Sequence, residues 1–259
     1  MARTKLQCRK LLILMDFSTI YKLCNIGDSN SNSSSSNSNA NSTIIQDCIL
    51  SLEYVTTDGT HHREYIDFMC DNIKSNSNDY YFVNAVWDKL IHMKLLNNFD
   101  SIEVWSDGGP HHFKTRYCQY MWHMISCIYF QGKRITHNFF PSYHGHSICD
   151  SHAAVDKQII KREYISSQQQ RMNVGNKTIY WGPNSIRDIQ LLIMNKLDNT
   201  TVIILDSIDR DPELKPSIAP LDRIKQKHCF VYENHTCIAY DMSIESTTTY
   251  PIPFTFKHR

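Results

Sequence analysis

Three aspartates stand where predicted elements end or begin. The apolar run Leu11 to Met15 stops at Asp16, a second apolar run delivers Asp107 onto a Gly-Gly-Pro turn, and Asp150 opens a helical segment roughly forty residues later. Acids at the ends of two strands and on a following helix are the minimum set that holds divalent metal ions against a phosphodiester. We therefore take Asp16, Asp107 and Asp150 as the candidate catalytic and metal-binding residues.

Neighbouring carboxylates repel each other unless a cation lies between them, so an acidic cluster implies a metal. Ligands that are all oxygen favour Mg²⁺ or Mn²⁺ over zinc. Two such ions about 4 Å apart would activate a water or a 3′-hydroxyl for in-line attack on a phosphodiester. Taken singly, each aspartate is also a common turn former or helix cap. Their joint placement favours the metal site.

The helix that follows the third acid carries a second candidate. Asp156 lies about 120° around a 3.6-residue helix from Asp150, so both acids cannot face one metal pair. Asp150 begins the helix, and Ala153 and Ala154 would let the helix approach the sheet closely. We prefer Asp150 and keep Asp156 in reserve. An alternative third acid could come from the loop after a later strand, which contains Asp206, Asp209 and Asp211.

Lysines flank the acids and are candidates for contacts with nucleic-acid phosphates. Lys114 follows the second acid, and Lys157 and Lys161 follow the third on the same side of the helix as Asp150. Such side chains bind phosphates without reading sequence. The alternative is a solvated helix face, which is the commoner use of lysines spaced by four.

Histidines and one cysteine crowd a sixteen-residue stretch and suggest zinc, because imidazole and thiolate are its ligands. Their spacing matches no finger or knuckle, and histidines beside the acids could instead contact phosphate or orient the attacking water. A zinc-binding adaptor is therefore a third hypothesis. The residues are His137, His144, His146, Cys149 and His152.

The order of predicted elements is strand, strand, strand, helix, strand, helix, strand, helix, which is the order of the ribonuclease H-like fold. We expect an α/β protein with a mixed five-stranded sheet flanked by helices, in which the first and fourth strands are parallel neighbours. The acids that end these two strands would then meet. The expected ranges are strands 10–17, 44–55, 65–70, 101–106 and 134–140 and helices 79–96, 113–129 and 150–165.

The chain divides at about residue 165. Residues 1–165 are the expected catalytic core, interrupted at 28–43 by a Ser/Asn-rich insertion that has too little to bury and should be disordered. Residues 166–259 are an α+β extension or subdomain, with a helix at 185–197, a strand at 202–205 and a hairpin-like pair at 229–241.

Composition predicts an intracellular globular protein without a membrane span. The 259 residues are 41% hydrophobic, and 27 basic against 26 acidic side chains give a net charge of +1, so nucleic acid would have to bind a local patch. No apolar run approaches the roughly 18 residues of a membrane span, and the N-terminus shows no signal sequence. Nine scattered cysteines without a C-x-x-C pair indicate reduced thiols.

Three blocks resemble eukaryotic DDE-type transposase-derived proteins. These blocks are D-F-S-T-I-Y from Asp16, W-S-D-G-G-P-H-H-F-K from Trp105 and H-G-H-S-I-C-D-S-H-A-A-V-D-K from His144. In that family the corresponding blocks read D-F-S-E-N-Y, then S-D-G followed by Q-F-K, then H-G-K-x-x-C-D-G-x-G-G-x-x-K. The similarity covers about Leu11 to Arg162 and implies a ribonuclease H-like core with acids at Asp16, Asp107 and Asp150.

The sequence departs from the family around the acids. Thr19-Ile20 replaces Glu-Asn, His112 stands for Gln, His146 stands for Lys, and small residues replace glycines in the third block. The acids are kept while their neighbours differ, and neither zinc-finger spacing nor a basic helix-turn-helix pattern precedes Asp16.

We therefore expect metal-dependent DNA strand transfer or phosphodiester cleavage, with Mg²⁺ or Mn²⁺ as cofactor and DNA as partner. Homo-oligomer formation is left open, and the presumed substrate places the protein in the nucleus or cytoplasm. The alternative is a catalytically inactive transposase remnant that serves as a nucleic-acid or protein interaction domain.

Overall fold

A computed structural model describes most of the chain. The described residues are 8–18, 21–24, 42–71, 79–109, 112–141, 147–169, 172–174, 177–179, 183, 185–211, 215–241 and 249–255. In chain order the elements are β1 (Lys10–Phe17), β2 (Tyr21–Cys24), β3 (Ser42–Val55), β4 (His61–Cys70), α1 (Tyr80–His92), β5 (Ser101–Ser106), α2 (Arg116–Tyr129), β6 (Arg134–Phe139), α3 (Ile148–Gln169), β7 (Met172–Val174), β8 (Lys177–Ile179), α4 (Ile186–Lys196), β9 (Thr200–Ile204), the 3₁₀ helix η2 (Ile224–Gln226), β10 (Cys229–Glu233), β11 (Thr236–Tyr240) and β12 (Thr249–Pro251).

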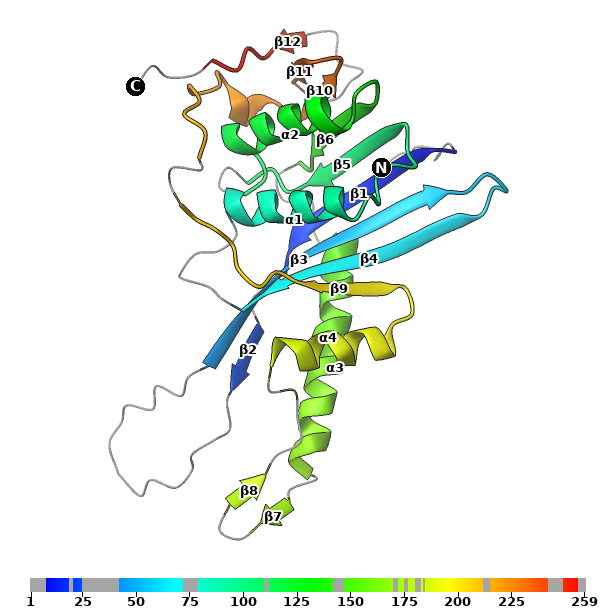
Figure 1. Cartoon of the computed structure of the whole chain (residues 1–259), viewed down its shortest axis with the longest axis vertical. Coiled ribbons are helices and arrows are strands. Elements are labelled where there is room, and N and C mark those ends of the chain that lie inside the picture. The colour runs from blue at the N-terminus through cyan, green and yellow to red at the C-terminus, as the bar shows by residue number, and fades with distance from the viewer. Residues whose placement is uncertain are drawn as a thin grey trace.

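One large mixed sheet runs through the molecule, with helices on both faces (Figure 1). Within the described ranges, nine strands follow one another in the order β12-β11-β10-β6-β5-β1-β3-β4-β9, and β2 pairs with β3 beside this path. The β1–β5, β5–β6 and β4–β9 pairs are parallel, whereas β1–β3, β3–β4 and β6–β10 are antiparallel. The expected mixed α/β architecture and the parallel pairing of the first and fourth predicted strands are confirmed.

The sheet is larger than the five strands expected. Strand β9 extends it beyond β4, and β10 to β12 extend it beyond β6. Residues after 165 thus complete both edges of the same sheet. The expected number was too small because β9 and β10, which attach these strands to the central sheet, pair with partners more than ninety residues away, a relation that local periodicity does not report.

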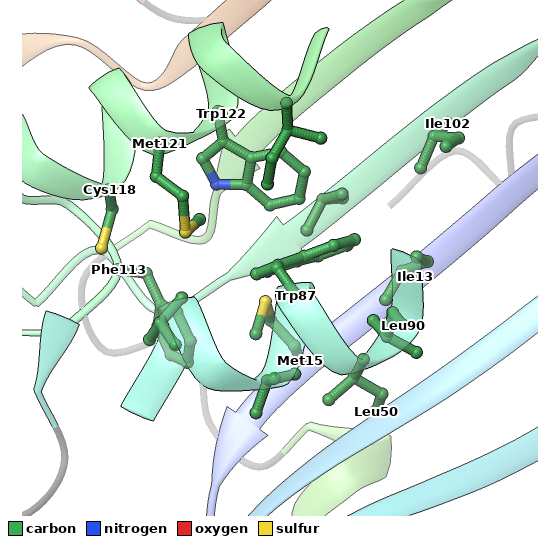
Figure 2. Close-up of a cluster of buried hydrophobic side chains, with 14 of the residues drawn as sticks. Ile13, Met15, Leu50, Trp87, Leu90, Ile102, Phe113, Cys118, Met121 and Trp122 are labelled. Carbon is green, nitrogen blue, oxygen red and sulfur yellow. The ribbon is translucent and has the colours of Figure 1, made fainter. Parts of the chain in front are cut away.

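The face covered by α1 and α2 holds the main hydrophobic core. Side chains of β1 that alternate with Asp16, including Ile13 and Met15, point to this face and are fully buried. Trp87 of α1 and Trp122 of α2 meet edge to face at 4.0 Å between ring centroids, and Figure 2 shows both packed over the strands. Caps define where these helices begin, since Asp79 accepts from the Phe82 N–H and Thr115 from the Cys118 N–H.

The opposite face is covered by α3 and α4. Ile49 of β3 packs against Cys149 and Ala153 of α3, and a second cluster joins Met69 of β4 to Ile189 of α4. Helix α3 continues well past the sheet (Figure 1). It therefore has one segment pressed on the strands and another that extends away from them.

Several expected boundaries differ from the structure. Strand β4 begins at His61 rather than 65, helix α1 ends at His92 rather than 96, and helix α2 begins at Arg116 rather than 113. Helix α3 runs to Gln169 rather than 165, and it begins at Ile148, so Asp150 lies in its first turn. The Ser/Asn-rich tract expected at 28–43 lies outside the described residues, apart from its last two residues, which belong to β3 and pair with β2.

Candidate metal centre

Two of the predicted acids meet because their strands are parallel neighbours. The register of β1 and β5 ends with the pair Met15 and Ser106, so Asp16 and Asp107 follow at the same end of the sheet. Alternation along both strands turns Met15 and Ser106 toward the α1 and α2 face and Asp16 toward the α3 face. Asp16 therefore faces the helix that carries Asp150, and Asp107 directly follows the end of the neighbouring strand.

The third acid reaches this place through the first turn of α3. The Ser147 N–H donates to Asp150 Oδ2 at 2.7 Å, and the Asp150 N–H donates to Ser147 Oγ at 3.3 Å, which is the reciprocal pattern of a capping box. The Ser147 hydroxyl also donates to Asp16 Oδ2 at 3.4 Å. Ser147 thus joins the acid on β1 to the acid on α3, and Asp150 is both a cap and a neighbour of Asp16.

The pKa of Asp16 depends on burial and on the two other acids. Burial raises the pKa of Asp16 to about 6, the carboxylates of Asp150 and Asp107 add to the rise, and hydrogen bonds from the Phe17 N–H and the Ser147 hydroxyl oppose it. The Asp150 and Asp107 charges therefore lie near enough to act on Asp16. Among the described residues, however, these three carboxylates do not bring one oxygen each within 4.8 Å of one another, as the ligand atoms of Asp67, His152 and Asp156 do. We call Asp16, Asp107 and Asp150 the acidic triad.

The turn after β5 holds Asp107 in place through a glycine. A Cβ added to Gly109 would lie 2.7 Å from Asp107 Oδ2 and 3.7 Å from His112 Nδ1. The carboxylate therefore rests against the bare backbone of Gly109. The His112 ring lies near the same position of Gly109 and contacts Phe17 edge on, at 5.6 Å between centroids. One histidine is therefore close to Asp107 of the acidic triad.

The three predicted phosphate-binding lysines have different environments. Lys114 is 4% exposed, its ammonium donates to the Lys225 carbonyl at 2.9 Å, and burial lowers its pKa to about 8. It packs over Phe139 and holds η2 against the loop before α2 rather than facing solvent. Lys157 is half-buried and Lys161 is exposed on α3.

The crowded histidines do not form one site. His137 of β6 is buried beside Trp122 under α2, whereas His152 of α3 stacks on Tyr65 at the opposite face of the sheet. His144 and His146 lie outside the described residues. The alternative third acids are also apart from the acidic triad, because Asp206, Asp209 and Asp211 are exposed and follow β9, which β4 and β3 separate from β1.

A second group of ligands was not predicted as a site. Asp67 of β4 lies with His152 and Asp156 of α3, and one side-chain donor atom of each lies within 4.8 Å of the others. Asp156 was the reserve for the acidic triad, but it points to β4. Two signals in the sequence indicate the group: an aspartate inside the apolar segment I-D-F-M-C, and a histidine and an aspartate four residues apart on one helix.

Comparison with known proteins identifies a family without a described activity. A family model with the description "Domain of unknown function (DUF8701)" matches residues 1–243. No curated protein matches the chain. Among the helices of the described ranges, none has the length and apolar character needed to cross a membrane.

Proposed function

The chain belongs to the DUF8701 family, and we propose that it is a divalent-metal-dependent enzyme that cleaves or transfers DNA phosphodiester bonds with the acidic triad. The observation that carries this proposal is that Asp16 and Asp107 follow one another across two parallel neighbouring strands, and that the Ser147 hydroxyl joins Asp16 to the helix turn that holds Asp150. The charges of Asp150 and Asp107 both raise the pKa of Asp16.

The arrangement of the central elements supports a ribonuclease H-like core of the kind found in DDE-type transposase-derived proteins. The central strands have the order β4-β3-β1-β5-β6, with β1, β5 and β6 parallel and β3 antiparallel. Helices α1, α2 and α3 follow β4, β5 and β6 in the chain. On this interpretation β9 to β12 are additions at the two edges.

The acidic triad fits Mg²⁺ or Mn²⁺. Its side-chain donors are carboxylate oxygens, which these ions prefer. Burial is the main cause of the raised pKa of Asp16, and the charges of Asp150 and Asp107 add to it; a cation would offset both effects. When bound, such ions activate a nucleophilic oxygen and stabilise the leaving oxygen of a phosphodiester. Asp16 and Asp107 would hold the ions from the strands, and Asp150 would complete the set from α3.

The remaining residues of the centre position its acids. Ser147 keeps the first turn of α3 beside Asp16, and the backbone at Gly109 gives room for the Asp107 carboxylate. His112 stands where it could contact a phosphate oxygen or accept a proton from a water.

DNA would follow α3 away from the acidic triad. Lys157 and Lys161 share the side of the helix that carries Asp150, about 10 Å and about 16 Å along its axis. A phosphate backbone that leaves the acids along α3 would meet Lys157 and then the exposed Lys161. We leave Lys114 out of this contact because its ammonium is directed to the Lys225 carbonyl.

The test is Mn²⁺-dependent nicking of supercoiled plasmid by the purified chain. We expect activity in the wild type and at least a hundredfold loss in both Asp16→Asn and Asp107→Asn, since removal of one metal-ligand charge weakens the binding of the ions. Asp198→Asn is the matched control, because Asp198 is an exposed aspartate in the turn between α4 and β9.

Two outcomes oppose the proposal. Activity that survives both substitutions would show that it does not come from the acidic triad. No activity in the wild type, together with no Mn²⁺ binding by calorimetry, would favour the alternative of an inactive remnant that serves as an interaction domain.

A further inference from the structure

A second group of metal-ligand residues lies on the same face of the sheet as the acidic triad but deeper in the protein. Asp67 comes from the middle of β4, and His152 and Asp156 come from successive turns of α3. Asp16, Ile49 and Asp67 are register partners across β1, β3 and β4, so two strand spacings, about 10 Å, separate the two aspartates. The groups are neighbours but not one site.

The three side chains point at one another. His152 Nε2 lies 3.4 Å from Asp67 Oδ2 and 3.5 Å from Asp156 Oδ2. The Tyr65 ring lies parallel to the imidazole, with centroids 3.9 Å apart and 2° between the planes, which restricts rotation of His152. One nitrogen and two carboxylate groups thus surround a common point in a held orientation.

The carboxylates of this group are closed off from water and incompletely paired. Asp67 and Asp156 are each 0% exposed, and His152 is 7% exposed. Asp67 Oδ1 and both oxygens of Asp156 accept no hydrogen bond from any residue that the structure describes. Unpaired carboxylate oxygens without solvent are costly, and the one hydrogen bond of this group, between His152 Nε2 and Asp67 Oδ2, leaves the other three oxygens without a donor.

The pKa values describe the same conflict. Burial raises the pKa of Asp67, and His152 opposes the rise. Burial and the Asp67 charge raise the pKa of Asp156 to about 7, while His152 and Lys157 oppose this. Burial alone would lower the pKa of His152, but the two carboxylates more than offset that effect and raise it. A bound cation would resolve all three perturbations.

We propose that Asp67, His152 and Asp156 form a structural Zn²⁺ site that fastens α3 to β4. An imidazole nitrogen with carboxylate oxygens suits zinc, and the unpaired second oxygen of a carboxylate would complete the four ligands of a closed structural site. Mg²⁺ suits a closed site less, because it dehydrates reluctantly and usually keeps several waters. The site is independent of the proposed phosphodiester chemistry. Its effect on the acidic triad would be indirect, because it would hold the helix that carries Asp150.

The experiment measures binding of ZnCl₂ to the full chain after removal of metal with a chelator. We expect one tightly bound zinc per chain by calorimetry and elemental analysis, and a rise in Tm of several degrees. Co²⁺ in place of zinc should give the visible absorption of a low-coordinate nitrogen and oxygen site. Asp67→Asn, Asp156→Asn and His152→Gln should each lower zinc affinity at least a hundredfold.

Loss of zinc binding through misfolding of a variant is distinguished by Asp156→Asn. Asp156→Asn keeps the shape of the side chain and removes a buried charge, so its metal-free Tm at pH 8 should equal or exceed that of the metal-free wild type while the zinc-induced rise disappears. Asp16→Asn, which alters the acidic triad, should keep the zinc and its Tm effect.

The proposal is overturned if Asp67→Asn and Asp156→Asn both still bind one zinc per chain. It is also overturned if the wild type binds no zinc. Nicking activity is scored separately on the same proteins. Loss of activity in Asp16→Asn with zinc retained would separate this site from the acidic triad.

Discussion

At the scale of single residues, environment gives the same side chain different properties. Asp16 is half-buried and faces two other acids at the rim of the sheet, whereas Asp156 is wholly buried beside one acid and one histidine. His152 and His137 differ in the same way, since two carboxylates face the first and none is paired with the second. Neighbours rather than residue type therefore decide which groups carry charge at neutral pH.

His137 makes the fold sensitive to acid. Its Nε2 lies 2.8 Å from Ser106 Oγ, and burial, with a smaller effect of the Lys114 charge, lowers its pKa to about 3. Because an unfolded histidine titrates near 6.5, the unfolded chain binds a proton between about pH 6.5 and 3 that the folded chain excludes. This residue alone should lower the free energy of unfolding by about 2 kcal/mol between pH 7 and pH 5.

Urea denaturation at pH 7 and pH 5 measures this effect. His137→Gln keeps a polar partner for Ser106 and should reduce the loss of stability at pH 5. His92→Gln, at an exposed position of α1, is the control. Equal pH dependence in the two variants would contradict the assignment to His137.

At the scale of elements, α3 is the part that connects the two candidate sites. Its first turn carries Asp150, its next two turns carry His152 and Asp156, and it is held on β3 through Cys149 and Ala153. The Cys149 thiol also donates to the Leu14 carbonyl at 3.4 Å. The distance between this helix and the sheet therefore sets the geometry of both sites at once.

Two neighbouring alanines test this dependence. Ala153 is 4% exposed against Ile49, whereas Ala154, which was expected to share the close approach, is exposed. Ala153→Leu should overpack the contact, cost about 1–3 kcal/mol of stability and lower Mn²⁺-dependent nicking by moving Asp150. Ala154→Leu adds the same volume to the exposed side and should change neither.

Chemical denaturation measures the stability of both variants, and plasmid nicking measures their activity. If Ala153→Leu kept full activity and stability, the helix would not need its close approach. An equal loss in Ala154→Leu would point to a general effect of leucine in α3 instead.

At the scale of the whole molecule, the sheet joins residues from both ends of the chain. Phe230 and Tyr232 of β10 are fully buried in the core that contains Trp87 and Trp122, and the Tyr232 hydroxyl bonds to Gln119 of α2. Strand β10 pairs with β6, and β9 pairs with β4. The residues after 165 thus contribute to the same core as the residues that carry the acids.

This shared core predicts cooperative unfolding. Phe230→Ala should lower the free energy of unfolding by about 3–5 kcal/mol, and the transition followed by tryptophan fluorescence should shift by as much as that followed by circular dichroism. Leu191→Ala is the control, because Leu191 lies on α4 with 60% of its surface exposed. A tryptophan transition that did not move in Phe230→Ala would mean that the C-terminal strands unfold independently.

The sequence by itself determined the central elements and the candidate acids. Alternating and helical periodicities are local, so strands β1, β5 and β6 and helices α1 to α3 were predicted close to their observed bounds. The expectation that Asp16 and Asp107 end neighbouring parallel strands came from the ribonuclease H-like order of elements, and the parallel register of β1 and β5 confirms that the two strands are neighbours.

The tertiary structure alone decided the edges of the sheet, the buried position of Lys114 and the group formed by Asp67, His152 and Asp156. Each depends on which distant segments lie side by side and which face of a strand or helix is covered. The periodicity of a segment predicts which face of the strand or helix is buried, but not what packs against that face. Asp67 of β4 and His152 of α3 are eighty-five residues apart in the sequence, so their contact is known only from the folded chain.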